Sequence, residues 1–273
     1  MKKKYYFPAL LFGCIASACA AQDEYFAGLK AGVSVPSLHG GDSGNDWNKN
    51  YTSRTGLYFG GFAEMPISKR FSLQPELVYA AEGGKRKGIQ PFTIPSEYLA
   101  AFQMAFNTTN DYIYANLNST SKINYLQLPV MLKYNLPLSK NGKWHAFAQA
   151  GPYVGYLIYA KQLVQADPLR VYVDGEGKTE IPQQYVVNFF GAKVDTLYPA
   201  KDQLKKINVG FQGALGVSRT LGPGKLFIEA GGNAGFITIQ KGSDHGNNNI
   251  GAATVLVGYG LGIGKNQKKE PLN

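Results

Sequence analysis

The sequence predicts an all-β fold, an eight-stranded antiparallel transmembrane up-and-down β-barrel with long extracellular loops. Three observations predict it. Eight segments alternate apolar and polar side chains with a period of two. The connections between them are short and long in turn, as in outer-membrane barrels. Charged residues make up only 17% of the chain, against about 25% in soluble domains.

The N-terminus has the features of an export signal. Lys2, Lys3 and Lys4 precede a mostly apolar stretch, and Ala18-Cys19-Ala20 fits a cleavage site. We therefore expect a signal peptide at residues 1–20, a barrel domain at 21–264 and a polar C-terminal tail at 265–273. Loss of the three signal lysines leaves 25 basic and 18 acidic residues, a charge of +7. This modest charge predicts no nucleic-acid partner.

Both cysteines, Cys14 and Cys19, fall inside the predicted signal. The exported chain is therefore expected to hold no disulfide, no cysteine-ligated zinc and no thiol nucleophile. The alternative for Cys19 is acylation, as in a lipoprotein, although Ala16 stands where a lipobox usually has leucine.

Two segments show the strand pattern most clearly. In residues 124–136 one face carries Leu126, Leu128, Val130, Leu132 and Tyr134, which suits lipid with a tyrosine at the headgroup level. Residues 71–81 repeat the pattern. Six further segments follow it: residues 25–35, 56–65, 145–159, 207–218, 225–239 and 251–264. Each is long enough for the 9–11 residues, roughly, of a tilted membrane-crossing strand. A soluble barrel would need several charges on every strand, and these carry about one.

The connections fix an expected topology. Residues 66–70, 137–144 and 219–224 are short, whereas residues 37–55, 82–121, 160–206 and 240–250 are longer and polar. Short turns and both termini are expected in the periplasm, and the long loops outside.

Several motifs resemble a known family. The stretches GLKAGVSVPSL (28–38), FSLQPELVYAAEGGK (71–85), YLQLPVMLKYNL (125–136) and AQAGPYVGYL (148–157) are similar to PorT-like outer-membrane β-barrel proteins, also called outer-membrane protein β-barrel domains. The resemblance covers nearly the whole exported chain. It implies a barrel in the bacterial outer membrane, in contact with outer-membrane lipid and lipopolysaccharide.

The inward faces of the strands predict a polar network in the barrel lumen. An eight-stranded barrel is just wide enough for side chains, and buried charges must pair or stay hydrated. The expected members are Lys30, Glu64, Glu76, Gln127, Lys133, Gln149 and Glu229, with Gln74 and Gln212 beside them. Because their strands are adjacent, we expect Glu76 and Lys133 to pair. The network is interpreted as a polar plug rather than an ion pathway.

The sequence predicts no enzyme, no cofactor and no metal site. A serine–histidine pair of Ser34 or Ser37 with His39 at the outer rim is the one catalytic alternative, while His145 and His245 lie apart. For a metal, Asp42, Asn45 and Asp46 cluster in the first long loop, and Asp244 and His245 lie in the fourth. Calcium takes several oxygen ligands, but this spacing does not fit an EF-hand loop.

The long loops are the expected functional surface. Lys85, Arg86 and Lys87 open the second loop, and residues 96–106 have the pattern of a short helix. Aromatic residues are frequent in residues 82–121 and 160–206, which suits an envelope protein partner or a glycan. The predicted function is therefore a non-enzymatic barrel with a structural or surface-binding role, as a stand-alone protein or within an envelope assembly. The alternatives are a narrow passive channel and, ranked lower, a lipid-modifying enzyme.

Overall fold

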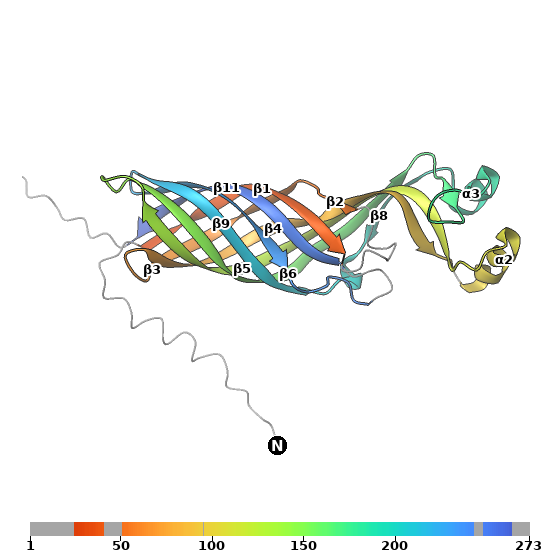
Figure 1. Cartoon of the computed structure of the whole chain (residues 1–273), viewed down its shortest axis with the longest axis horizontal. Coiled ribbons are helices and arrows are strands. Elements are labelled where there is room, and N and C mark those ends of the chain that lie inside the picture. The colour runs from red at the N-terminus through yellow and green to blue at the C-terminus, as the bar shows by residue number, and fades with distance from the viewer. Residues whose placement is uncertain (1–24, 41–50, 95, 243–247, 264–273) are drawn as a thin grey trace, which may run out of the picture.

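The computed structural model describes residues 25–40, 51–94, 96–242 and 248–263, and it is nearly all β (Figure 1). The strands are β1 (Tyr25–Gly40), β2 (Tyr51–Thr52), β3 (Gly56–Pro66), β4 (Phe71–Thr93), β5 (Tyr112–Pro137), β6 (Trp144–Ala166), β7 (Val171–Tyr172), β8 (Val194–Pro199), β9 (Ile207–Leu221), β10 (Gly224–Gly235) and β11 (Asn248–Ile263). The described helices are α2 (Ser96–Phe106), α3 (Gln183–Phe190) and the short 3-10 helix η2 (Lys201–Gln203).

Eight of these strands form a closed ring in which every neighbouring pair is antiparallel. The ring runs β1, β3, β4, β5, β6, β9, β10 and β11, and it closes where β11 pairs with β1 from Tyr25↔Ile263 to Gly40↔Asn248. Closure matters because lipid offers no hydrogen bonds to an open strand edge. The predicted eight-stranded antiparallel barrel is confirmed.

The predicted strand segments fall in the eight ring strands, with two differences at their ends. β10 stops at Gly235, so residues 236–239 are not part of it. β11 is described up to Ile263. The three connections predicted to be short are tight turns, and they lie at the end of the barrel where β1 begins (Figure 1).

The prediction of loops at residues 82–121 and 160–206 is wrong over much of their length. β4 and β5 stay paired from Gly83↔Lys122 to Thr93↔Tyr112, and β6 runs on to Ala166. The physical reason is the change of solvent. Beyond the lipid, no strand face needs to be wholly apolar, so the one-sided stripe that marks a membrane strand disappears. Glycine and proline within residues 83–91 also imitate turn signals.

These strand extensions build an arm, which we define as residues 87–118 and 165–195. It projects from the end of the barrel opposite the short turns and carries α2 and α3 (Figure 1). The helix predicted at residues 96–106 is confirmed as α2. The arm has an apolar core of its own, made of Ala115, Leu117, Ala166, Leu169, Val171, Val173, Ile181 and Val186, with Val164 at its base.

The outer face of the ring is apolar and is bordered by aromatic rings. Along β5 the side chains of Leu126, Leu128, Val130 and Leu132 are exposed while their neighbours are buried. At the turn end Phe71 packs on Tyr134 with ring centroids 5.1 Å apart, and Trp144 lies nearby on β6. At the arm end Tyr79, Tyr156 and Tyr159 form a second border. Two aromatic girdles around an apolar band are the pattern of a lipid-facing barrel.

The predicted signal peptide at residues 1–20 and the predicted polar tail at 265–273 lie outside the described residues. Within the described part of the chain, no helix has the length and apolar character needed to cross a membrane.

A charge at the centre of the lipid face is expected to destabilise the barrel. Val130 is the middle of the five outward residues of β5, and its side chain is 43% exposed. Val130→Arg should lower the free energy of unfolding by roughly 2–4 kcal/mol, the range for arginine at the bilayer midplane. The measurement is denaturant unfolding of the protein in lipid vesicles.

Val187 on α3 provides the matched control, because it is the same residue type at 44% exposure but lies in the arm. Val187→Arg should change the stability by no more than about 0.5 kcal/mol. Equal effects at both positions would mean that Val130 faces water.

Candidate functional site

The interior of the barrel is polar and closely packed. Lys30, Glu64, Glu76, Gln127, Lys133, Gln149 and Glu229 all lie there, each no more than 4% exposed, with Gln74 and Gln212 beside them. Glycines make room for large inward side chains. A Cβ on Gly216 would lie 2.3 Å from the ring of Phe147, and one on Gly258 would lie 2.2 Å from the ring of Phe227. Gly216 on β9 and Gly258 on β11 therefore leave space for neighbouring aromatic rings.

The layer nearest the short turns is centred on Glu64. Its carboxylate accepts hydrogen bonds from Lys133 Nζ at 2.9 Å and from Lys225 Nζ at 3.2 Å, and from Ser72 Oγ at 3.2 Å. Lys133 Nζ also lies 4.3 Å from the ring centroid of Phe147. Lys225 Nζ lies 4.0 Å from the ring centroid of Phe26. Both lysine charges are thus shared between a carboxylate and an aromatic face.

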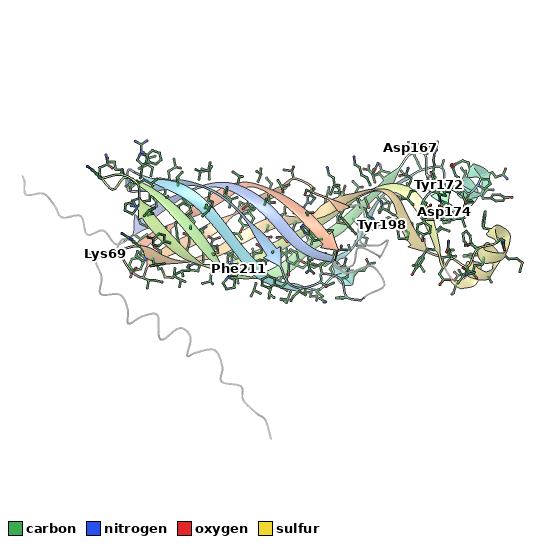
Figure 2. The ribbon with its side chains drawn as sticks, in the orientation of Figure 1. Lys69, Asp167, Tyr172, Asp174, Tyr198 and Phe211 are labelled. Carbon is green, nitrogen blue, oxygen red and sulfur yellow. The ribbon has the colours of Figure 1, made fainter. Side chains whose placement is uncertain are left out.

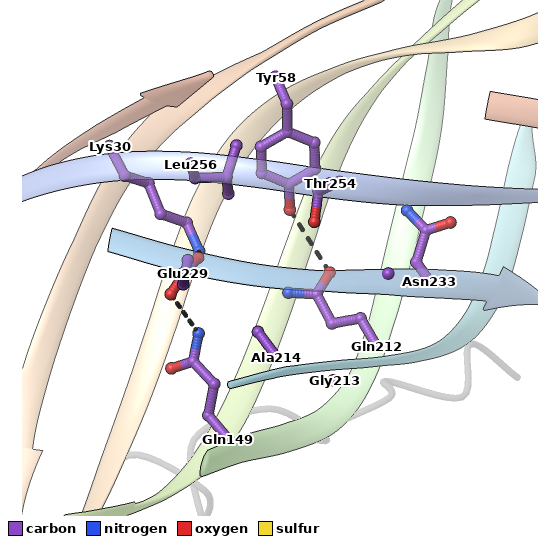
Figure 3. A pocket seen from close by; sticks show the side chains of 11 residues that line it. Lys30, Tyr58, Gln149, Gln212, Gly213, Ala214, Glu229, Asn233, Thr254 and Leu256 are labelled. Atoms are coloured by element: carbon purple, nitrogen blue, oxygen red, sulfur yellow. Dashed lines mark hydrogen bonds and ion pairs between the residues drawn. The ribbon is translucent and has the colours of Figure 1, made fainter. Parts of the chain in front are cut away.

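The middle layer is centred on Lys30. Its Nζ lies 2.8 Å from Glu76 Oε2 and 2.9 Å from Glu229 Oε1. Gln149 Nε2 donates to Glu229 Oε2 at 2.9 Å, as Figure 3 shows, and Gln74 Nε2 donates to Glu76 Oε1 at 2.8 Å. One cation therefore holds two carboxylates, and neutral amides satisfy part of their remaining hydrogen-bonding capacity.

The predicted ion pair between Glu76 and Lys133 does not form. Lys133 lies opposite Ser72 in the β4–β5 register, four residues from Glu76 along β4, and it pairs with Glu64 instead. Gln74 connects the two layers, because its Oε1 accepts from Lys133 Nζ at 3.2 Å while its Nε2 donates to Glu76. Adjacent strands are staggered in a barrel, so adjacency alone does not bring two side chains together.

A third polar layer lies toward the arm, and most of its residues were not in the predicted network. Glu82 Oε1 accepts from Gln127 Nε2 at 2.8 Å and from Asn233 Nδ2 at 3.2 Å. Glu82 lies one residue beyond the expected strand of residues 71–81, yet it continues the inward series of Gln74 and Glu76 at even numbers. Lys225 is also absent from the predicted network, although it shares the parity of Glu229 on β10 and pairs with Glu64. Continuing the alternation past residue 81 would have found Glu82, and applying it from the first residue of the expected segment 225–239 would have found Lys225.

An apolar cluster closes the mouth of the barrel above this layer. It consists of Leu38, Ile123, Tyr125, Leu157, Ala160, Leu204, Ile239 and Ile250. The interior cavity drawn in Figure 3 lies among Lys30, Tyr58, Gln149, Gln212 and Glu229 and measures about 10 Å³. That volume holds about one water molecule. The described interior is filled by side chains that hold the strands in place.

The residues considered for catalysis and calcium do not assemble in the described part of the chain. Ser34 Oγ donates to the carbonyl of Ala81 at 3.0 Å and is buried, while His39 lies opposite Asn249 in the β1–β11 register. His145 lies at the turn end of β6. Asp42, Asn45, Asp46, Asp244 and His245 lie outside the described residues. Among the described residues, no three His, Cys, Asp or Glu side chains gather as metal ligands.

The arm exposes aromatic side chains to solvent. Those at least one-third exposed are Phe92, Tyr98, Tyr112, Tyr185 and Phe190, whereas Phe102 and Phe106 pack against the arm core. Figure 2 shows Tyr172, Asp174 and Asp167 on the arm and Tyr198 near its base. Of the basic residues predicted in this segment, Lys85 and Lys87 are exposed, while Arg86 is buried with its guanidinium 5.5 Å from the ring centroid of Tyr51.

A turn in the arm is held by Asp174. Its carboxylate accepts backbone N–H groups of Lys178 at 2.9 Å, Thr179 at 2.7 Å and Glu176 at 3.0 Å. These bonds, that of Lys178 foremost, hold the pKa of Asp174 below its ordinary value. The turn is therefore fully bonded at neutral pH, and it loosens only as the pH falls through that lowered pKa.

Loss of Lys30 is expected to be among the most damaging single changes in the lumen. Lys30→Met leaves Glu76 and Glu229 buried without their cation, which should cost about 3–5 kcal/mol of unfolding free energy. The combined variant Lys30→Met, Glu76→Gln and Glu229→Gln removes the uncompensated charges and should recover most of that loss. The measurement is denaturant unfolding in lipid vesicles.

Lys178→Met provides the control, because its ion pair with Glu176 is exposed. That change should cost less than about 1 kcal/mol. A Lys30→Met variant as stable as Lys178→Met would show that the network does not hold the barrel together.

The chain matches the model of a known family over most of its length. The outer membrane protein beta-barrel domain model matches residues 20–241. A search of curated proteins finds no match. Among solved structures, similarity is found to Ail, the attachment invasion locus protein of Yersinia pestis, at 8% identity and a TM-score of 0.35, covering 88% of this chain and 100% of Ail.

Two other solved structures show similarly low sequence identity and TM-scores. Neisserial surface protein A shows 12% identity and a TM-score of 0.32, covering 85% of this chain and 95% of that one. The outer membrane protease OmpT of Escherichia coli shows 9% identity and a TM-score of 0.32, with 88% and 97% covered. The family match agrees with the closed ring and the apolar outer face of the structure. The chain belongs to the outer membrane protein β-barrel domain family, and it resides in the bacterial outer membrane.

Proposed function

We propose that this protein is a non-enzymatic surface-binding protein, in which the barrel is the anchor and the arm is the binding element. The observation that carries the proposal is the arm itself. It projects from one end of the barrel, has a separate apolar core and exposes aromatic side chains that its own core does not use. A barrel that only filled a membrane would not need such an extension.

The proposal includes an orientation. The signal peptide at residues 1–20 exports the chain. The N- and C-termini of the barrel domain and the short turns face the periplasm, and the arm faces the outside of the cell. Outer-membrane barrels combine short periplasmic turns with long external segments, and the same division of lengths occurs here.

The arm is suited to hold a binding surface away from the membrane. From Asn124 to Tyr112, β5 continues for twelve residues, which is roughly 40 Å along the strand at about 3.3 Å per residue. Its pairing with β4 is continuous over this length. Exposed tyrosines at its tip and flank offer flat apolar faces with a hydroxyl, a combination that favours binding interfaces.

A glycan is the partner class that these side chains favour, because tyrosine rings stack on sugar rings while their hydroxyls hydrogen-bond to sugar hydroxyls. An envelope protein is the second candidate. The PorT-like motifs of residues 71–85 and 125–136 favour that second candidate, with the barrel as a component of an envelope assembly.

The channel alternative receives little support from the interior. The described lumen contains three buried charge layers, an apolar cluster at its mouth and a cavity of about 10 Å³. Discrete conductance steps in planar-bilayer recordings of the purified protein would revive it. The enzyme alternative has less support still, because Ser34 is engaged with a backbone carbonyl rather than with His39.

Surface labelling tests the orientation. The exported chain is expected to lack cysteine, so single cysteines can be introduced at Tyr98 on α2 and at Lys140 in a short turn. On intact cells, a membrane-impermeant maleimide should label Tyr98→Cys and spare Lys140→Cys until the outer membrane is permeabilised. The reverse pattern would place the arm in the periplasm and overturn the proposal.

Removal of the arm tests its role in binding. Lys87 lies opposite Asn118, and Gln165 lies opposite Asp195, so each pair can be joined by a two-residue Asn-Gly turn in place of the arm. On an array of bacterial and host surface glycans, the full-length protein should bind a subset of glycans. The shortened protein should bind them at least about tenfold more weakly, because the aromatic contact residues are gone.

Folding of the shortened barrel is the control. The apolar cluster at the mouth lies outside the removed segments, so the variant should keep the heat-sensitive gel mobility of a folded barrel. A folded variant that binds as well as the full-length protein would contradict the assignment of binding to the arm.

A further inference from the structure

The outward face at the arm end of the barrel carries two lysines directly opposite each other. Lys122 on β5 and Lys161 on β6 are registered partners across the strand pair. Directly opposite residues have Cβ atoms about 4.5–5.5 Å apart, and like charges in that position repel. Lys122 is exposed and Lys161 half-buried, with its Nζ 5.5 Å from the ring centroid of Tyr159.

Three further lysines lie beside this pair. Lys201, Lys205 and Lys206 are exposed and belong to the segment that joins β8 to β9. Lys201 Nζ donates to the carbonyl of Ile158 at 3.2 Å, and the carbonyl of Lys206 accepts the N–H of Leu157 at 2.8 Å. These bonds fix the segment against β6, three and four residues from Lys161. We call Lys122, Lys161, Lys201, Lys205 and Lys206 the basic patch.

No acidic side chain neutralises the basic patch within the described residues. The ion pairs found there involve Lys30, Lys133, Lys178 and Lys225, and none of these belongs to the patch. Asp202 on η2 is the one carboxylate in the same segment, and it forms none of those pairs. The patch therefore keeps a surplus of at least four positive charges beside a strand pair that already suffers repulsion.

The position of the patch relative to the lipid indicates what neutralises it. One row of registered residues across β4, β5 and β6 consists of Tyr79, Leu126 and Tyr156. The next row toward the arm consists of Asn124 on β5 and Tyr159 on β6. Lys122 and Lys161 follow one side-chain repeat later, roughly 7 Å further along the strands. The aromatic girdle marks the edge of the hydrocarbon, so the basic patch lies at the depth of the outer-leaflet headgroups.

We propose that the basic patch binds the phosphate groups of an outer-leaflet glycolipid, the lipid A portion of lipopolysaccharide, with Lys122 and Lys161 sharing one phosphate. The phosphate replaces the lysine–lysine repulsion by two attractive contacts. Lys201, Lys205 and Lys206 contact the neighbouring phosphate or sugar. This proposal rests on the orientation proposed above, and it is independent of what the arm binds.

The test uses the full-length protein in mild detergent and diphosphoryl lipid A as the probe. Binding is measured by native mass spectrometry or by the rise in unfolding temperature. Wild-type protein should prefer diphosphoryl to dephosphorylated lipid A. The double variant Lys122→Gln, Lys161→Gln should bind diphosphoryl lipid A roughly 30-fold more weakly, about fivefold for each lysine lost near a charged membrane surface.

The matched control is Lys140→Gln with Lys143→Gln, two exposed lysines of a short turn at the opposite end of the barrel, which should leave binding unchanged. A second variant, Lys201→Gln with Lys206→Gln, changes residues outside the strands and should also weaken binding. It replaces the first variant in the test if Lys122→Gln with Lys161→Gln does not fold. The proposal is overturned by equal weakening in the control, by no preference for phosphorylated lipid A, or by equally tight binding of inorganic phosphate. Glycan binding by the arm should be unaffected in every variant.

Discussion

The closure of the strand ring is the constraint on which the rest of this structure depends. In a bilayer no water is present to satisfy a free strand edge, so β1 must meet β11 along their whole length. Eight strands make a narrow ring, and a narrow ring must be filled by side chains. The polar interior follows from this requirement. Inward side chains do not contact lipid, and together they fill the narrow interior. They do so as layers of paired charges and amides.

The interior layers show how buried charge is tolerated in such a ring. Lys30 holds two carboxylates, Glu64 is held by two lysines, and Gln74 connects the two groups. Each centre alone would be unbalanced by one charge, and the imbalances have opposite sign. Joined through amides, they compensate each other within the barrel. This arrangement binds β1, β3, β4, β5 and β10 together from the inside, in addition to the hydrogen bonds between their backbones.

The sequence predicts the membrane part of this fold well because lipid imposes a simple rule. Outward residues such as Leu126, Leu128 and Val130 must all be apolar, so the strands are visible as alternation. The pairing inside the lumen is not predictable in the same way, because the stagger of each strand on the next decides whether Glu76 meets Lys30 or Lys133. The arm is hidden for the opposite reason. Outside lipid, residues 83–93 and 112–120 need no apolar face, so nothing in their pattern separates strand from loop.

One consequence of the continuous strands concerns mechanical load. The arm is joined to the barrel by β4, β5 and β6 themselves, which run from the lipid-facing ring into the arm without a linker. A pull on the tip of the arm acts along those strands. Their inter-strand hydrogen bonds are then strained in shear, many at a time, rather than opened one after another from an end. A force applied at the tip of the arm is therefore transmitted directly to the membrane-embedded ring, and the arm is stiff along its length.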